Sequence, residues 1–205
     1  MAIAFPLTTL GLPKGFNNWR WINGHAQGSV PLAYDFKDYI YDFGGRIWAF
    51  EANIPPLYGR ANYEPWFSWL TSLDGRIGTF LAGPPDGKAP RGIGTGTPLI
   101  AGANQVGRTI NVDGFTASTT NILRVGDYLT INSYLYKNLL DVNSVGGGAC
   151  TLEIWPALRS SPADNTPITV LNCTSIFRLL ESFNPVDLVP QLMNGLTIRA
   201  AEDLP

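Results

Sequence analysis

The sequence predicts a mainly β protein: a β-sandwich hub domain with one short helix and an inserted small β-barrel of the OB or SH3 kind. The 22 glycines and 16 prolines are spread along the chain between short apolar runs, a spacing typical of turn-rich β proteins. Many of these runs alternate apolar and polar residues, which is the strand pattern. Only one segment has helical periodicity.

Two strand regions are expected before that helix. Residues 17–24 read as a strand in which Trp19 and Trp21 share a face. Residues 37–51 form two alternating runs separated by Gly44-Gly45, so we predict a β-hairpin that turns at these glycines.

The helix is predicted over residues 62–73. Asn62 is the expected N-cap, Glu64 and Pro65 suit the first turn, and Gly75 would end the helix. The apolar residues recur at i, i+3, i+4 and i+7, and they are Trp66, Trp69, Leu70 and Leu73. We expect this stripe to pack on a sheet, and residues 75–81 to return to strand.

A linker or long loop is expected over residues 82–97, where apolar residues are rare. Beyond it, evenly spaced runs predict five short strands, at residues 108–112, 128–132, 134–142, 150–155 and 168–171. The predicted core of this barrel consists of Ile110, Leu129, Ile131, Leu139, Leu152 and Ile154.

The end of the chain supplies two further strands, at residues 175–180 and 195–200, which we expect to rejoin the first part of the chain. The predicted hub therefore comprises residues 1–90 plus 165–205, and the inserted barrel comprises residues 96–164.

The composition argues against several functional classes. Charged residues make up 15% of the chain, below the roughly 25% of an ordinary domain, which favours an assembly subunit whose surface is covered by partners. The 14 Lys and Arg residues are scattered and the net charge is −2, so no nucleic-acid-binding face is expected. No apolar run approaches the ~20 residues of a membrane span.

The first residues and the two cysteines indicate in which cellular compartment, oxidising or reducing, the protein is expected. Residues 1–6 lack the basic and apolar regions of a secretory signal. Without such a signal, Cys150 and Cys173 are expected to be free buried thiols, although a disulfide between them remains possible.

No set of residues predicts a catalytic, cofactor or metal site. The one histidine, His25, has no metal-ligand or nucleophile pattern near it. The glycines of residues 92–96 precede Pro98 rather than a helix, so they favour a connector over a phosphate loop. The acidic group Asp35, Asp38 and Asp42 lacks calcium-loop spacing and is expected to be a solvated edge.

Two further possibilities depend on side chains whose partners the sequence does not fix. A glycosidase would need two paired carboxylates, but nothing pairs the available residues, which are Glu51, Glu64, Glu153 and Glu181. Trp19, Trp21 and Trp155 could serve as a sugar-stacking platform, or belong to the core or to a subunit interface. We expect a protein that is not an enzyme and needs no cofactor.

An ordered set of segments resembles a known family. Besides the Trp-rich strand at residues 17–24, the set comprises Ile54-Pro55-Pro56-Leu57, Gly75-Arg76-Ile77-Gly78-Thr79-Phe80-Leu81, residues 96–107, Val125-Gly126-Asp127-Tyr128 and residues 152–162. In this order, over roughly residues 17–182, they resemble the small distal tail or minor tail proteins of long-tailed bacteriophages (siphoviruses) and gene transfer agents. No single segment is specific by itself.

The resemblance implies a structural virion protein whose β-sandwich hub assembles into a hexameric ring. Such a ring would continue the tail tube and join it to the baseplate hub and fibre-bearing proteins, and possibly to the tape-measure protein. The expected location is the virion tail, assembled in the bacterial cytoplasm. The family has no catalytic residues to carry over. The alternatives are another tail component (a tube, terminator or baseplate subunit) or a glycan-binding tail module.

Overall fold

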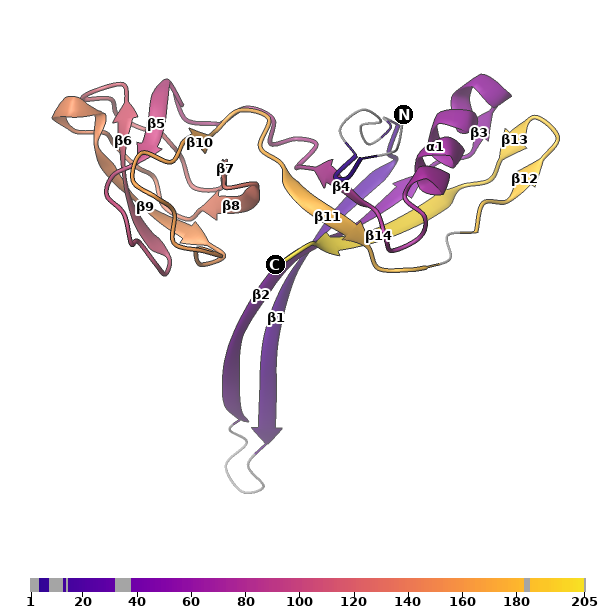
Figure 1. Ribbon diagram of the computed structural model, residues 1–205, viewed down its shortest axis with the longest axis horizontal. Coiled ribbons are helices and arrows are strands. Elements are labelled where there is room, and N and C mark those ends of the chain that lie inside the picture. Colours follow the sequence, from indigo (N-terminus) through magenta and orange to yellow (C-terminus); the bar gives the residue numbers. More distant parts are fainter. Residues whose placement is uncertain (1–3, 8–12, 14, 32–37, 183–184, 205) are drawn as a thin grey trace. The chain divides into compact units, whose positions relative to one another are not determined.

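The computed structural model describes residues 4–7, 13, 15–31, 38–182 and 185–204. Its contacts divide the chain into two compact units, residues 1–80 with 177–205 and residues 81–176 (Figure 1). The described chain is mainly β, with a single α-helix, as the sequence predicted. The second unit is an insertion, but it starts at residue 81 instead of 96 and ends at residue 176 instead of 164.

A five-stranded sheet forms the centre of the hub unit, in the order β1-β2-β14-β11-β4. Its strands are β1 (Asn18–Pro31), β2 (Asp38–Ile54), β14 (Leu196–Glu202), β11 (Ser175–Leu179) and β4 (Thr79–Ala82). The late strands β11 and β14 lie inside this sheet, so the end of the chain rejoins its first part as expected. A small second sheet, in the order β12-β13-β3, is formed by β12 (Leu188–Val189), β13 (Leu192–Met193) and β3 (Leu57–Tyr58).

The hub core is aromatic, and the helix α1 (Arg60–Ser72) contributes to it. The predicted stripe is buried, and the Trp69 ring meets Phe80 of β4 edge to face at 4.8 Å. The predicted N-cap is wrong, because Gly59 occupies that position and the Asn62 side chain donates instead to the carbonyl of Tyr58. The helix ends where Asp74 and Gly75 adopt positive φ.

The predicted hairpin turn at Gly44-Gly45 is also wrong. Strand β2 runs through both glycines and pairs with β1 from Asn18↔Asn53 to Pro31↔Asp38. The register shifts between His25 and Gln27, which face Arg46 and Asp42, so the glycines form a bulge. Gly44 has a φ of 78°, which glycine adopts without strain both in a bulge and in a hairpin turn. A pair of glycines in the sequence therefore does not distinguish the two. The connection over residues 32–37 lies outside the described residues.

The inserted unit is a nearly closed six-stranded sheet, in the order β10-β7-β8-β9-β6-β5. Its strands are β5 (Gly96–Ile100), β6 (Thr109–Phe115), β7 (Tyr128–Ile131), β8 (Tyr134–Asn138), β9 (Cys150–Trp155) and β10 (Ile168–Thr169), with a short 3₁₀ turn, η1 (Gly146–Gly148), before β9. The two edge strands approach each other, since Leu99 bridges Pro167 and the Ile100 N–H donates to Thr166 O at 3.0 Å. Five of these strands match the prediction, and β5 was missed.

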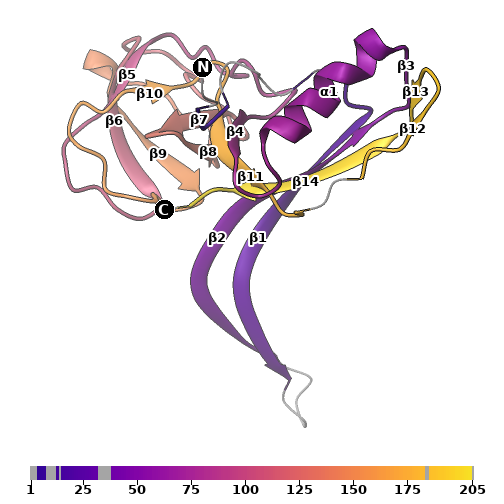
Figure 2. The same cartoon turned by 45° about the vertical axis from the view of Figure 1, so that its right-hand side comes forward.

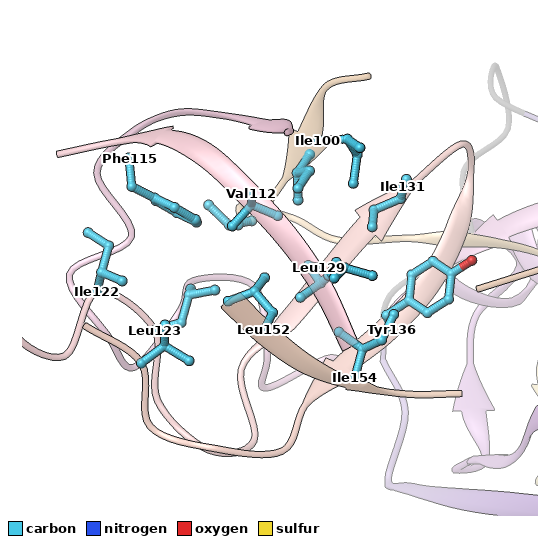
Figure 3. Close-up of a cluster of buried hydrophobic side chains, with 14 residues drawn as sticks. Ile100, Val112, Phe115, Ile122, Leu123, Leu129, Ile131, Tyr136, Leu152 and Ile154 are labelled. Atoms are coloured by element: carbon cyan, nitrogen blue, oxygen red, sulfur yellow. The ribbon is translucent and has the colours of Figure 1, made fainter. Parts of the chain in front are cut away.

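The barrel has its own apolar core, which Figure 3 shows as a cluster of side chains from all around the sheet. Of the six predicted core residues five belong to it, but Leu139 is half-buried and lies outside the cluster. Ile168 and Val170 also belong to this core, so the strand after residue 164 closes the barrel rather than returning to the hub.

The predicted linker over residues 82–97 is an irregular segment held against the barrel. The Ile93 and Gly94 amides donate to the carbonyls of Asn121 and Ile122, and Lys88 O accepts from the Asn172 amide. Buried Asp127 accepts the amides of Arg91 and Gly92 at 2.6 and 3.0 Å, and that of Arg124 at 2.8 Å. Each of these contacts uses at least one backbone group, so composition gives no sign of them.

Candidate functional site

The feature that stands out for function is a two-stranded arm, formed by residues 23–31 of β1 and 38–48 of β2. Strand β14 pairs with β2 only from Ala49 to Ile54, so no third strand accompanies the arm among the described residues. Figures 1 and 2 show this ribbon leaving the hub sheet. Both of its outer edges therefore present backbone N–H and C=O groups that no described strand pairs.

One face of the arm is apolar. Paired residues of an antiparallel ribbon point to the same side, and the pair Val30↔Tyr39 is followed two residues along by Gly28↔Tyr41. Phe43 extends this face, because its ring lies 3.3 Å from where a β-carbon on Gly28 would be. Val30, Tyr39, Tyr41 and Phe43 are 53, 59, 55 and 74% exposed.

The opposite face of the arm is more polar. It carries the pairs Ser29↔Ile40 and Gln27↔Asp42, so Ile40 is its one large apolar residue along this stretch. The arm is thus amphipathic. An isolated two-stranded hairpin is marginally stable in water, and burying an exposed aromatic side chain favours association by roughly 1.5–3 kcal/mol. An exposed apolar face of this kind is typical of interaction surfaces.

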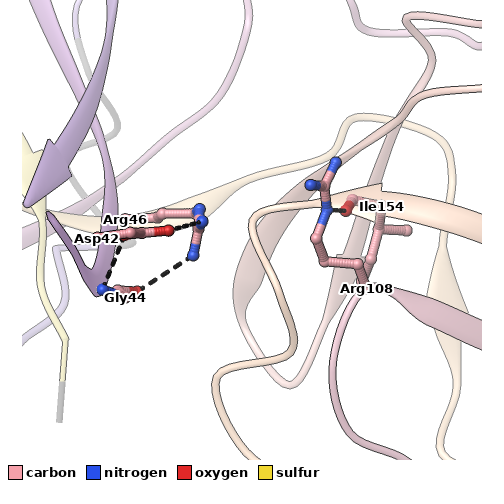
Figure 4. A network of polar contacts seen from close by, with 5 residues as sticks. All are labelled: Asp42, Gly44, Arg46, Arg108 and Ile154. Atoms are coloured by element: carbon pink, nitrogen blue, oxygen red, sulfur yellow. Dashed lines mark hydrogen bonds and ion pairs between the residues drawn. The ribbon is translucent and has the colours of Figure 1, made fainter. Parts of the chain in front are cut away.

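The bulge within the arm is stabilised by one carboxylate. Asp42 accepts the Gly44 amide at 2.9 Å and pairs with Arg46 at 2.6 Å, while Arg46 also donates to Gly44 O at 3.4 Å (Figure 4). The hydrogen bond from Gly44, and then Arg46, lowers the pKa of Asp42. Asp42 is exposed on the arm, as expected of a solvated edge, and it also holds the bulge geometry. Asp38 is exposed at the start of β2, and Asp35 lies outside the described residues.

The other residues weighed from sequence are placed as follows. His25 is exposed on the arm. The amides of residues 92–94 are used by Asp127 and by neighbouring carbonyls, so they form no phosphate loop. Among the described residues no group of three or more His, Cys, Asp or Glu side chains is placed to hold a metal ion.

Each of the four glutamates has a partner near the surface. Glu51 and Glu181 share Arg199, at 2.9 and 3.5 Å, and Glu64 pairs with Arg60 at 3.2 Å. Glu153 accepts the Thr109 hydroxyl at 2.7 Å and lies 3.6 Å from Arg108, whose Nε also donates to Ile154 O (Figure 4).

The three tryptophans considered as a sugar platform are not coplanar. Trp19 stacks on Phe50 with centroids 4.0 Å apart and meets Trp21 at 71°. Trp21 in turn packs against Trp48, and Trp155 is buried in the barrel unit. The shared face of Trp19 and Trp21 thus belongs to the aromatic layer of the hub sheet.

Both cysteines are free thiols. Burial raises the pKa of each to about 11. No helix in the described part of the chain is long and apolar enough to cross a membrane.

Comparisons with known proteins give no family assignment. No family model matches the chain, and no curated protein is significantly similar to it. The resemblance to phage tail proteins therefore stays a prediction.

Proposed function

We propose that this chain is a structural protein of a tailed-phage virion: a distal tail protein whose copies form a ring between the tail tube and the tail-tip complex. The observation that carries the proposal is the amphipathic arm with two unpaired edges. The ordered sequence resemblance supplies the phage context, and the arm supplies a physical means of assembly.

The arm suits head-to-tail assembly. Its β1 edge and its β2 edge are different surfaces of one ribbon, so the β1 edge of one copy pairs with the β2 edge of the next. A repeated head-to-tail contact generates a closed ring when the rotation closes, and an open helical tube when it does not. Each added copy forms hydrogen bonds with edge N–H and C=O groups that are exposed to water in the monomer.

The apolar face of the arm adds a second driving force. When neighbouring ribbons pair edge to edge, their Val30, Tyr39, Tyr41 and Phe43 side chains form one continuous apolar surface, which favours burial against adjoining subunits or tail proteins. The low charged content, 15%, reduces the cost of desolvating that surface. In this proposal the ring is hexameric and resides in the virion tail. Its partners are the tube protein, the baseplate hub and the fibre-bearing proteins.

The first test is mass photometry of the purified chain over a range of concentrations, followed by electron microscopy of large species. Wild type is expected to form closed rings. The variant Tyr39→Ser/Tyr41→Ser/Phe43→Ser removes the apolar face and is expected to be monomeric with an unchanged hub. Tyr58→Ser is the matched control, since Tyr58 is an aromatic residue of the hub that is 71% exposed away from the arm.

The outcomes separate this proposal from its alternatives. Open tubes instead of closed rings would favour a tube or other tail component. A wild-type chain that stays monomeric at all concentrations and binds host glycans would favour a glycan-binding tail module. Rings that persist in the triple variant would rule out the arm's apolar face as the assembly surface.

A further inference from the structure

The barrel unit contains a small polar pocket that has no part in the assembly proposal. Its volume is about 210 Å³, and it is lined by Asp86, Gly87, Ala89, Arg91, Gly126, Asp127, Tyr128 and Lys137. These residues come from the irregular segment before β5 and from the start of β7 and the end of β8. All of them belong to the unit of residues 81–176, so the pocket is built within one folded body.

Two cationic side chains converge over the glycine at the pocket floor. A β-carbon on Gly126 would lie 3.8 Å from Lys137 Cε and 4.0 Å from Arg91 Nη1. Within the described chain neither cation forms a salt bridge; Lys137 lies over the Tyr128 ring at 5.0 Å, and Arg91 donates to Val125 O at 3.2 Å. Two like charges held together favour the binding of an anion between them.

One of the two carboxylates that line the pocket is already occupied by backbone donors. Asp127 is buried and uses its oxygens to accept the backbone amides of Arg91, Gly92 and Arg124. It therefore organises the loops that carry the pocket, and within the described residues it forms no salt bridge with Arg91 or Lys137. A carboxylate or phosphate is the group that such donors bind best.

Two further lining residues differ in chemistry from the cations. Asp86 is exposed and supplies acceptor oxygens, and Tyr128, beneath Lys137, supplies an aromatic ring and a hydroxyl. The Tyr128 hydroxyl is protonated at neutral pH, and burial, and then the charge of Asp86, raises its pKa further, to about 12. A ligand that places an anion near Arg91 and Lys137 therefore meets hydrogen-bond partners for hydroxyl groups beside it.

We propose that this pocket binds an acidic sugar, with the sugar's carboxylate or phosphate held between Arg91 and Lys137 and its hydroxyls directed to Asp86 and Tyr128. The volume of the pocket, about 210 Å³, is below the range typical of drug-sized ligands, so it has room for one small ligand unit. In a tail protein this site would contact an anionic surface polysaccharide of the host, but binding itself does not depend on ring formation.

The test is titration calorimetry and saturation-transfer NMR of the full chain at low ionic strength. The ligands are glucuronate, glucose 6-phosphate, glucose, acetate and inorganic phosphate. Glucuronate or glucose 6-phosphate is expected to bind, and the tighter of the two identifies the anion as carboxylate or phosphate. Arg91→Gln and Lys137→Gln are each expected to weaken binding about tenfold or more, because each removes a charged donor. Lys88→Gln, which changes an exposed cation outside the pocket, is the matched control.

Three results would overturn the proposal. Equal binding of glucose would remove the need for an anion, and equal binding of acetate or inorganic phosphate would remove the need for a sugar. If Arg91→Gln and Lys137→Gln bind the ligand as strongly as the control Lys88→Gln, the binding site lies elsewhere. Thermal unfolding of every variant separates loss of binding from loss of fold.

Discussion

At the scale of single residues, Asp127 stabilises the barrel loops through backbone amides. Its buried carboxylate joins residues 91–92 to residue 124, which are far apart in sequence. Asp141 has a simpler role, since it is exposed and accepts one amide, from Val125, at 2.8 Å. Comparing the two aspartates therefore compares a buried carboxylate that accepts three hydrogen bonds with an exposed carboxylate that accepts one.

Asp127→Ala is expected to lower the free energy of unfolding by about 3 kcal/mol, because it leaves three partly buried amides without their acceptor. Asp141→Ala is expected to cost less than about 1 kcal/mol, because water replaces its single bond. Urea unfolding followed by fluorescence measures both values. Equal losses in the two variants would show that the Asp127 network contributes little.

The thiols predict an alkaline pH dependence. Burial raises the pKa of Cys150 and Cys173 from 9.0 to about 11, so the fold favours the neutral thiols. This contribution to stability is fully present below pH 9 and is lost as the pH rises from 9 through 11. The melting temperature is therefore expected to fall over that window.

The double variant Cys150→Ala/Cys173→Ala tests this linkage. It is expected to melt at a lower temperature at neutral pH, because it leaves space in the barrel, but to decline less steeply between pH 9 and 11. Calorimetry at several pH values gives both slopes. A slope as steep as that of wild type would assign the alkaline loss to other groups, of which Tyr128 is the first candidate.

At the scale of elements, α1 stabilises the hub through one side only. Trp69 is fully buried against Phe80, whereas Phe67 on the same helix is 40% exposed. Trp69→Ala is expected to lower the free energy of unfolding by about 3–5 kcal/mol, and Phe67→Ala by less than about 1 kcal/mol. Denaturant unfolding distinguishes them, and similar costs would mean that the helix packs differently in solution.

The elements also show what the sequence could and could not predict. Helical periodicity found α1 and its buried stripe, and alternation found five barrel strands, because both patterns report directly on which side chains are buried. The Gly44-Gly45 bulge was mistaken for a turn, because glycine at positive φ is common to both. Strand β5 was missed because glycine and proline interrupt its apolar pattern.

The candidate sites were harder to predict for a different reason. Tyr39, Tyr41 and Phe43 alternate in the sequence, but alternation does not reveal that their face lacks a covering layer. That follows from the pairing of β14, which stops at Ala49 of β2. The cations of the pocket, Arg91 and Lys137, come from segments far apart in the chain, and only the folded barrel brings them over Gly126.

At the scale of the whole molecule, the barrel is a separable insertion in the hub. It leaves β4 and returns into β11, which are neighbours in the hub sheet. The ends of the insertion meet, since a β-carbon on Gly83 would overlap the carbonyl of Cys173. Residues 81–176 also enclose their own core. These features predict that each unit folds without the other.

Residues 81–176 expressed alone are therefore expected to be a folded monomer that unfolds in one cooperative transition. The complementary variant joins Gly83 to Thr174 through a short Gly/Ser linker, and it is expected to keep the hub fold and the self-association of the arm. Amide-resolved NMR of the first and mass photometry of the second are the measurements. The arm lies wholly in the hub, so the variant without the barrel keeps it. If this variant no longer assembles, the ring contact belongs to the inserted unit, and the arm contacts another protein.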